Sequence, residues 1–172
     1  MKRLLLAILS GLLLGFSWPY VGYYGLIFIA FVPLLILEST ISRDARHRSL
    51  KVFGYSFLSF FIFNVITTYW IWHATLIGSL AAFCINAFLM SLTFLIFHRI
   101  KRSFTGSILI CYFSFVVLWI SMEYLHLNWE LAWPWLTLGN VFASFPDHVT
   151  WYRFTGILGG SLWVLTVNYV VF

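Results

Sequence analysis

Two acidic residues and a histidine near position 126 have a spacing that suits one face of a helix. Glu123, His126 and Glu130 are three and four residues apart, and residues at those separations are neighbours on a helix surface. If a helix continues past Leu125, the three side chains form a polar lining. Carboxylates accept hydrogen bonds, and imidazole both donates and accepts them, so the lining could hold part of a polar ligand, or it could simply face water.

The residues around this group are rich in tryptophan. Four tryptophans fall within 17 residues, Pro134 restricts the backbone, and Gly139 allows a turn. Indole rings pack against acyl chains while their N–H groups reach polar atoms, and Arg153 is placed to meet a phosphate. We therefore expect residues 127–152 to form a lipid-facing cleft, with a plain aromatic anchor as the alternative. The expected lipid-binding residues are Glu123, His126, Trp133, Pro134, Trp135, Gly139 and Arg153.

The composition shows what kind of protein must position these groups. Of 172 residues, 62% are hydrophobic, 22% aromatic and only 9% charged, and the mean hydropathy is +0.96. A soluble domain carries about 25% charged residues, so a sizeable water-soluble domain is excluded. The spans lack the alternation of barrel strands. The sequence predicts an all-α integral membrane protein with a bundle of about six transmembrane helices in one domain.

The expected spans follow the long apolar runs, and each needs around 20 residues. A turn at 18–22 joins the first two runs, and a strongly polar loop at 38–51 follows the second. A second basic loop follows at 98–102, and the outer segment is 127–152. The spans are expected at about 4–17, 23–37, 52–72, 74–97, 104–125 and 155–172.

Basic residues test this layout, because short cytoplasmic loops carry the excess Lys and Arg. With the N-terminus in the cytoplasm, nine of the ten basic residues fall on the cytoplasmic side, and only Arg153 falls outside. The net charge of +5 therefore reports topology rather than nucleic-acid binding. Both termini are expected on the cytoplasmic side.

Other polar or small residues in the spans are interpreted as structural. Gly11 and Gly15 form one small-xxx-small pair and Gly156 and Gly160 another, which suits close helix packing. Cys84 and Cys111 lie in apolar runs with no metal-ligand spacing. Polar groups at membrane depth typically bond to a neighbouring helix; these are Asn64, Asn86, Asn168, Thr67, Thr68 and Thr166.

The two ends of the chain carry further signals. Residues 1–17 have the charged and apolar regions of a signal peptide, but an apolar run beginning at Gly22 favours the first arm of a membrane hairpin. The last run stops at Phe172 without flanking basic residues. We expect the sequence to be part of a longer protein.

Three blocks of residues together resemble the N-terminal membrane part of the apolipoprotein N-acyltransferase family. The outer block, with Trp119, Glu123 and the run Trp133-Pro134-Trp135-Leu136-Thr137-Leu138-Gly139-Asn140, is the most specific. His126 departs from the Arg that members often have. The other two blocks are Gly15-Phe16-Ser17-Trp18-Pro19-Tyr20 with Phe31-Val32-Pro33-Leu34, and Thr155-Gly156-Ile157-x-Gly159-Gly160-Ser161 with Val167-Asn168.

The resemblance implies a bacterial inner-membrane acyltransferase. Such an enzyme moves an acyl chain from a phospholipid donor to the α-amino group of the lipid-modified N-terminal cysteine of an apolipoprotein. It implies eight membrane helices and a periplasmic nitrilase-like domain with a Glu, Lys and Cys triad, which this sequence lacks. The resemblance assigns no catalytic residue, metal or cofactor to this chain, which would bind lipid and be inactive alone.

Two other functions stay open. A truncated paralogue could act as a lipid-binding or membrane-assembly protein, which requires that it be expressed and stable at this length. A small-solute transporter is disfavoured because no Asp, Glu, Lys or Arg lies near the middle of any expected span, and ion-coupled transport usually needs one.

Overall fold

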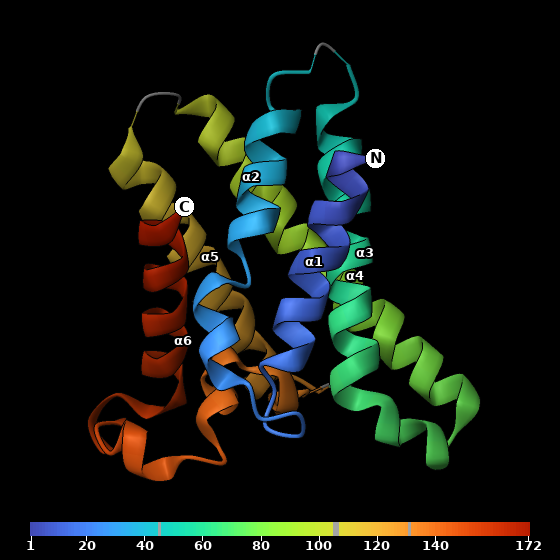
Figure 1. Ribbon diagram of the computed structural model, residues 1–172, viewed down its shortest axis with the longest axis vertical. Coiled ribbons are helices and arrows are strands. Elements are labelled where there is room, and N and C mark those ends of the chain that lie inside the picture. Colours follow the sequence, from blue (N-terminus) through green and yellow to red (C-terminus); the bar gives the residue numbers. More distant parts are fainter. Residues whose placement is uncertain (45, 105–106, 131) are drawn as a thin grey trace.

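The computed structural model describes residues 1–44, 46–104, 107–130 and 132–172, and these residues are helical, without β-strands (Figure 1). The all-α prediction is confirmed. The six α-helices are α1 (Lys2–Phe16), α2 (Val32–Ile41), α3 (Arg48–Thr68), α4 (Leu76–Ser103), α5 (Ile108–Asn128) and α6 (Tyr152–Val171). Five short 3-10 helices join them: η1 (Tyr24–Ile29), η2 (Tyr69–His73), η3 (Pro134–Leu136), η4 (Leu138–Phe142) and η5 (Pro146–Val149).

Five helical segments are long and apolar enough to cross a membrane. They are Tyr24–Ile41, Arg48–His73, Leu76–Ser103, Ile108–Asn128 and Tyr152–Val171. The remaining helix, α1, has 15 residues and is therefore about 22 Å long, shorter than the roughly 30 Å hydrocarbon core. Within the described residues, the structure thus has the six helices that the sequence predicts, and α1 is the short one.

The second span is broken at Ala30 and Phe31, between η1 and α2. Asn168 of α6 pairs with the backbone groups at the break. Its Oδ1 accepts from the Phe31 N–H at 2.8 Å, and its Nδ2 donates to the Ile27 carbonyl at 2.7 Å. Backbone groups at membrane depth need such partners because no water reaches them. The Asn168 side chain therefore bonds to a neighbouring helical segment, as the sequence predicted for polar groups in the spans. Thr67 and Thr68 do not follow that prediction, because each donates to a carbonyl of its own helix.

Small residues and aromatic rings pack the centre of the bundle. A Cβ at Gly11 would lie 2.9 Å from the Ile62 side chain, and one at Gly15 would lie 2.7 Å from that of Ile66, so α1 approaches α3 closely. The Trp119 ring is fully buried and meets Phe31 edge-on at 4.8 Å. These contacts join α1, α3 and α5 around the broken second span.

The basic end of the bundle differs from the expected water-exposed loops. The loop predicted at 38–51 is shorter, because α2 continues to Ile41 and α3 begins at Arg48. The loop predicted at 98–102 is helical, since α4 runs to Ser103. The reason is burial: Glu38 and His98 are both inaccessible to solvent and lie 2.7 Å apart between Oε1 and Nδ1, so the polar pair closes the space between α2 and α4.

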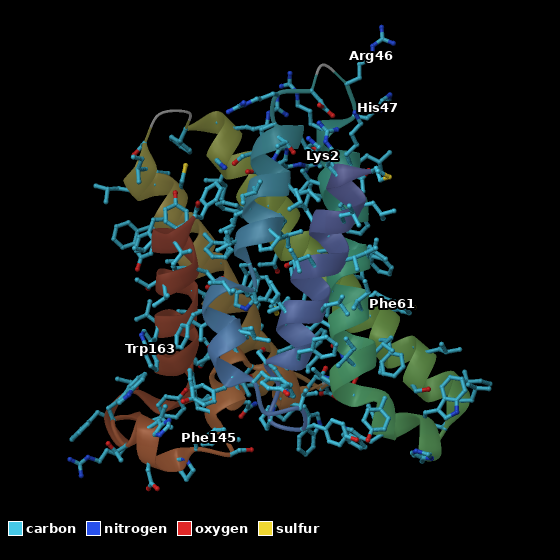
Figure 2. All side chains as sticks on the ribbon, viewed as in Figure 1. Lys2, Arg46, His47, Phe61, Phe145 and Trp163 are labelled. Carbon is cyan, nitrogen blue, oxygen red and sulfur yellow. The ribbon has the colours of Figure 1, made fainter. Side chains whose placement is uncertain are left out.

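Asp44 organises the turn that links α2 to α3. It accepts hydrogen bonds from the Arg3 guanidinium at 2.7 Å and from Lys51 Nζ at 2.6 Å. The Arg3 hydrogen bond, followed by that of Lys51, lowers the pKa of the Asp44 carboxyl well below its usual range. Figure 2 shows Lys2, Arg46 and His47 at this end of the molecule and Phe145 at the opposite end.

The segment after α5 forms a layer of short 3-10 turns across the end opposite the basic residues. This segment contains η3, η4 and η5 and leads into α6, and Figure 1 shows it in orange at the lower end of the bundle. Both chain termini point toward the other end. The segment therefore lies at the end of the bundle opposite the basic residues, and its assignment to the outer, interfacial layer stays a prediction.

Candidate functional site

Glu123 is the buried carboxylate at the centre of the site, near the end of α5. Its side chain is 3% exposed. Its Oε1 accepts from the Trp119 indole N–H at 3.1 Å and from the Leu138 backbone N–H at 2.8 Å. The first bond orients the carboxylate along its own helix, and the second fastens η4 to α5. Glu123 therefore does not face water, and one of its hydrogen bonds holds the outer segment in place.

Gly139 fastens the same segment to α6. Its N–H donates to Ser161 Oγ at 3.1 Å, and its carbonyl accepts from the Tyr152 hydroxyl at 2.9 Å. A Cβ at Gly139 would collide with the Ile157 carbonyl oxygen, so the glycine is needed for this close approach. The block that resembles the family most specifically is thus held on one side by α5 and on the other by α6.

A small cavity lined by polar and apolar side chains, here called the Glu123 cavity, lies directly beside Glu123. It offers about 20 Å³ to the centre of a water-sized molecule, which is room for one water. Three buried polar atoms of its lining residues have no hydrogen-bond partner among the residues that the structure describes: Glu123 Oε2, His126 Nδ1 and Trp133 Nε1. Buried polar atoms are normally paired. Three of them around one cavity indicate a place that can take a hydrogen-bonding group from a ligand.

An apolar groove between α4 and α5 adjoins this cavity. Its volume is about 320 Å³. Met122 and His126 line both spaces, and the His126 ring meets the Trp129 ring edge-on at 5.2 Å. The other lining residues are Leu89, Leu92, Thr93, Ile96, Leu118, Ser121, Leu125 and Trp129. An apolar groove and a small cavity with unpaired polar atoms therefore share part of their lining.

The structure brings together only some of the expected lipid-binding residues. Glu123, His126 and Trp133 meet at the cavity, with the Trp133 backbone N–H donating to the His126 backbone carbonyl at 3.0 Å. Glu130 lies beyond the end of α5 and is exposed, so it does not share the helical face. Pro134 begins η3, and its carbonyl accepts from Asn140 Nδ2 at 2.7 Å.

Trp135 and Arg153 lie apart from the Glu123 cavity. Trp135 is 54% exposed, meets Trp70 edge-on at 6.0 Å, and lines a separate cleft of about 440 Å³ with Trp18, Pro19, Tyr20, Thr67, Tyr69, Trp70, Asn140 and Ala143. Arg153 is exposed, with its guanidinium over the Phe154 ring at 4.5 Å. The cavity therefore has no arginine among its lining residues.

Several site residues were not expected from the sequence. Asn86 and Met90 of α4 line the cavity, together with Thr137 of the outer segment. Asn86 is recognisable in the sequence as a polar group at membrane depth, but nothing in the sequence pairs it with α5. Ser161 and Tyr152 lie in or next to a family block, but their bonds to Gly139 depend on the tertiary fold.

Comparison with known proteins identifies relatives over nearly the whole chain. Residues 10–170 match the family described as "Apolipoprotein N-acyltransferase N-terminal domain". The apolipoprotein N-acyltransferase of Chlorobaculum tepidum is 31% identical over 175 residues, covering 99% of this chain and 31% of the relative. That of Geobacter metallireducens is 29% identical over 175 residues, covering 98% and 32%. The chain spans about a third of the length of these curated relatives, and no solved structure matches it.

Proposed function

The chain belongs to the apolipoprotein N-acyltransferase N-terminal domain family, and on that premise we propose that it is the lipid-positioning membrane portion of such an enzyme. The enzyme would transfer an acyl chain from a phospholipid to the N-terminal diacylglyceryl-cysteine of apolipoproteins in the bacterial inner membrane. Bond chemistry would belong to a nitrilase-like domain. The names of the relatives and the multi-pass helical fold support this assignment.

One observation carries the proposal: the apolar groove and the Glu123 cavity share the side chains of Met122 and His126. An acyl-linked glycerolipid has the same two parts in the same order, an apolar chain joined to a polar ester. The chain would lie along α4 and α5, and the ester would reach the cavity beside Glu123. The groove is lined almost wholly by apolar side chains, which is the character of lipid tails.

The unpaired atoms indicate which part of the lipid is held. The Trp133 indole N–H is a donor, so it would donate to an ester carbonyl oxygen, and a cavity with room for one water suits an atom of that size. A phosphate is a poorer fit, because it favours Arg or Lys partners and the cavity contains the Glu123 carboxyl instead. In this account Trp133 and His126 donate to the ester, Glu123 holds the outer segment around it through Leu138, and none of the three does bond chemistry.

A chimera tests the proposal. This chain would replace the matching part of the Chlorobaculum tepidum relative, with transfer of an acyl chain to a diacylglyceryl-cysteine peptide as the assay. Leu92→Trp fills the groove and should lower kcat/KM about tenfold, equivalent to about 1.4 kcal/mol of transition-state stabilisation. The control is Ile85→Trp, two turns away on α4, exposed and outside the groove. It should change kcat/KM little.

Two results would contradict the proposal. Equal losses in Leu92→Trp and Ile85→Trp would mean that the groove has no special part in the reaction. A chimera with the unaltered chain that inserts and folds but transfers no acyl chain would mean that this membrane portion does not support acyl transfer.

A further inference from the structure

A second pocket lies at the basic end of the molecule, between the start of α3 and the end of α4. Its volume is about 330 Å³, and its lining residues are His47, Arg48, Ser49, Leu50 and Arg102. Arg48 and Arg102 are more than 50 positions apart in the sequence, so the packing of α3 on α4 creates this pocket. It lies at the other end of the bundle from the Glu123 cavity, and the proposed acyl transfer does not use it.

The acidic side chains at this end are already paired with other cations. Asp44 binds Arg3 and Lys51, and Glu38 binds Lys101. Arg48 donates from Nε to the Asp44 backbone carbonyl rather than to a carboxylate. No acidic residue lines the pocket. Within the part of the chain that the structure describes, the two arginines therefore present positive charge to the pocket without a carboxylate to neutralise it.

A ridge of aromatic rings continues from the pocket along α3. Leu50, at the pocket, is 69% exposed. Phe53, Phe57 and Phe61 follow at helical spacing and are partly exposed, with stacked ring centroids 6.2 and 6.1 Å apart. Phe88 of α4 meets Phe53 edge-on at 5.7 Å. An apolar surface of this kind, beginning at a basic pocket, matches the shape of a phospholipid with its chains directed into the membrane.

We propose that this pocket binds the phosphate of an anionic glycerophospholipid from the leaflet on the basic side, with an acyl chain along Leu50, Phe53, Phe57 and Phe61. Arginine guanidinium groups form the strongest hydrogen bonds to phosphate. Basic pockets between membrane helices on the cytoplasmic side suit anionic head groups. A zwitterionic head group fits less well, because its ammonium would enter a pocket that no carboxylate lines.

The test compares two double variants of the chain in nanodiscs that contain equal amounts of phosphatidylglycerol and phosphatidylethanolamine. Bound lipid is counted by native mass spectrometry after release from the discs. Arg48→Gln/Arg102→Gln should retain phosphatidylglycerol about thirtyfold less, because each of the two cations contributes about 1 kcal/mol near the surface. Arg43→Gln/Arg99→Gln removes the same charge at the same end, from exposed residues outside the pocket, and should retain the lipid.

Each other result has a defined meaning. If both double variants lose the same amount of bound phosphatidylglycerol, or if neither loses any, the assignment of this pocket as the lipid site is overturned. Release of the lipid by millimolar inorganic phosphate would show a free-anion site and would also overturn the proposal. If Arg48→Gln/Arg102→Gln unfolds, Arg102→Gln alone serves instead, because Arg102 is exposed, and unchanged retention in it would overturn the assignment. None of these readouts depends on acyl transfer.

Discussion

The two buried carboxylates of the chain lie toward opposite ends of the bundle and are treated differently by their surroundings. At the basic end, Glu38 Oε1 accepts from His98 Nδ1 and Ser42 Oγ, both at 2.7 Å, and Oε2 accepts from Lys101 Nζ at 2.6 Å. At the other end, Glu123 uses only Oε1, and its Oε2 has no partner among the described residues. Both oxygens of Glu38 are hydrogen-bonded within the protein, whereas one oxygen of Glu123 is left without a partner beside the cavity.

The difference separates a structural polar cluster from a candidate binding site. A buried charge is tolerated when its hydrogen-bonding capacity is filled, and both oxygens of Glu38 meet that condition within the protein. The cluster joins α2 to α4 and needs no ligand at its carboxylate. The Glu123 cavity leaves acceptors and a donor unpaired, together with an apolar groove beside them. The two carboxylates therefore have different roles, which their numbers of partners reveal, although His98 Nε2 in the Glu38 cluster also has no partner among the described residues.

The largest difference in unfolding free energy should come from making the same substitution at both carboxylates. Glu38→Gln removes the anion between Lys101 and His98 and should cost about 3 kcal/mol of unfolding free energy, because an uncompensated charge remains in a buried pair. Glu123→Gln should cost less than about 1 kcal/mol, since an amide oxygen can still accept from Trp119 and Leu138. Reversible unfolding in mixed micelles measures both values. Equal costs would remove the distinction between the two ends.

A smaller contrast should come from two glycines. Gly139→Ala places a Cβ against the Ile157 carbonyl and should lower the unfolding free energy by about 1–3 kcal/mol, as overpacking does. The matched change is Gly54→Ala inside α3, where nothing lies within 4 Å of the added Cβ. It should raise stability by about 0.5–1 kcal/mol, because alanine favours a helix over glycine. The same unfolding assay applies. A neutral Gly139→Ala would mean that the outer segment is not held tightly against α6.

The sequence was sufficient for the helical class and for the end of the bundle at which basic residues gather. Apolar runs and Lys and Arg positions are local properties, and both survive in the structure. The buried state of Glu38 was not predictable in the same way. It lies at the boundary between an apolar run and a polar run, and its burial depends on Lys101 and His98, 60 or more residues away.

The candidate site was predictable only where helical spacing applies. Glu123 and His126 share a face because α5 continues past Leu125 to Asn128, which is the condition that the spacing argument required. The positions of Trp135 and Arg153 depend on the path of η3, η4 and η5. These turns are too short for a helical repeat of apolar residues to predict their path from the sequence. For that reason Trp135 reaches Trp70, and Arg153 lies over Phe154, rather than either lining the cavity. The break in the second span, closed by Asn168, depends equally on a distant residue.

The central claim is that the groove between α4 and α5 holds an acyl chain, and photo-crosslinking tests it most directly. The chain would be placed in nanodiscs with a phospholipid that carries a diazirine on one acyl chain, and the labelled peptides would be mapped. The account predicts labelling concentrated on groove residues such as Leu89, Leu92, Leu118 and Leu125, lost in Leu92→Trp and kept in Ile85→Trp. Even labelling of all lipid-facing helices, unchanged by Leu92→Trp, would contradict it.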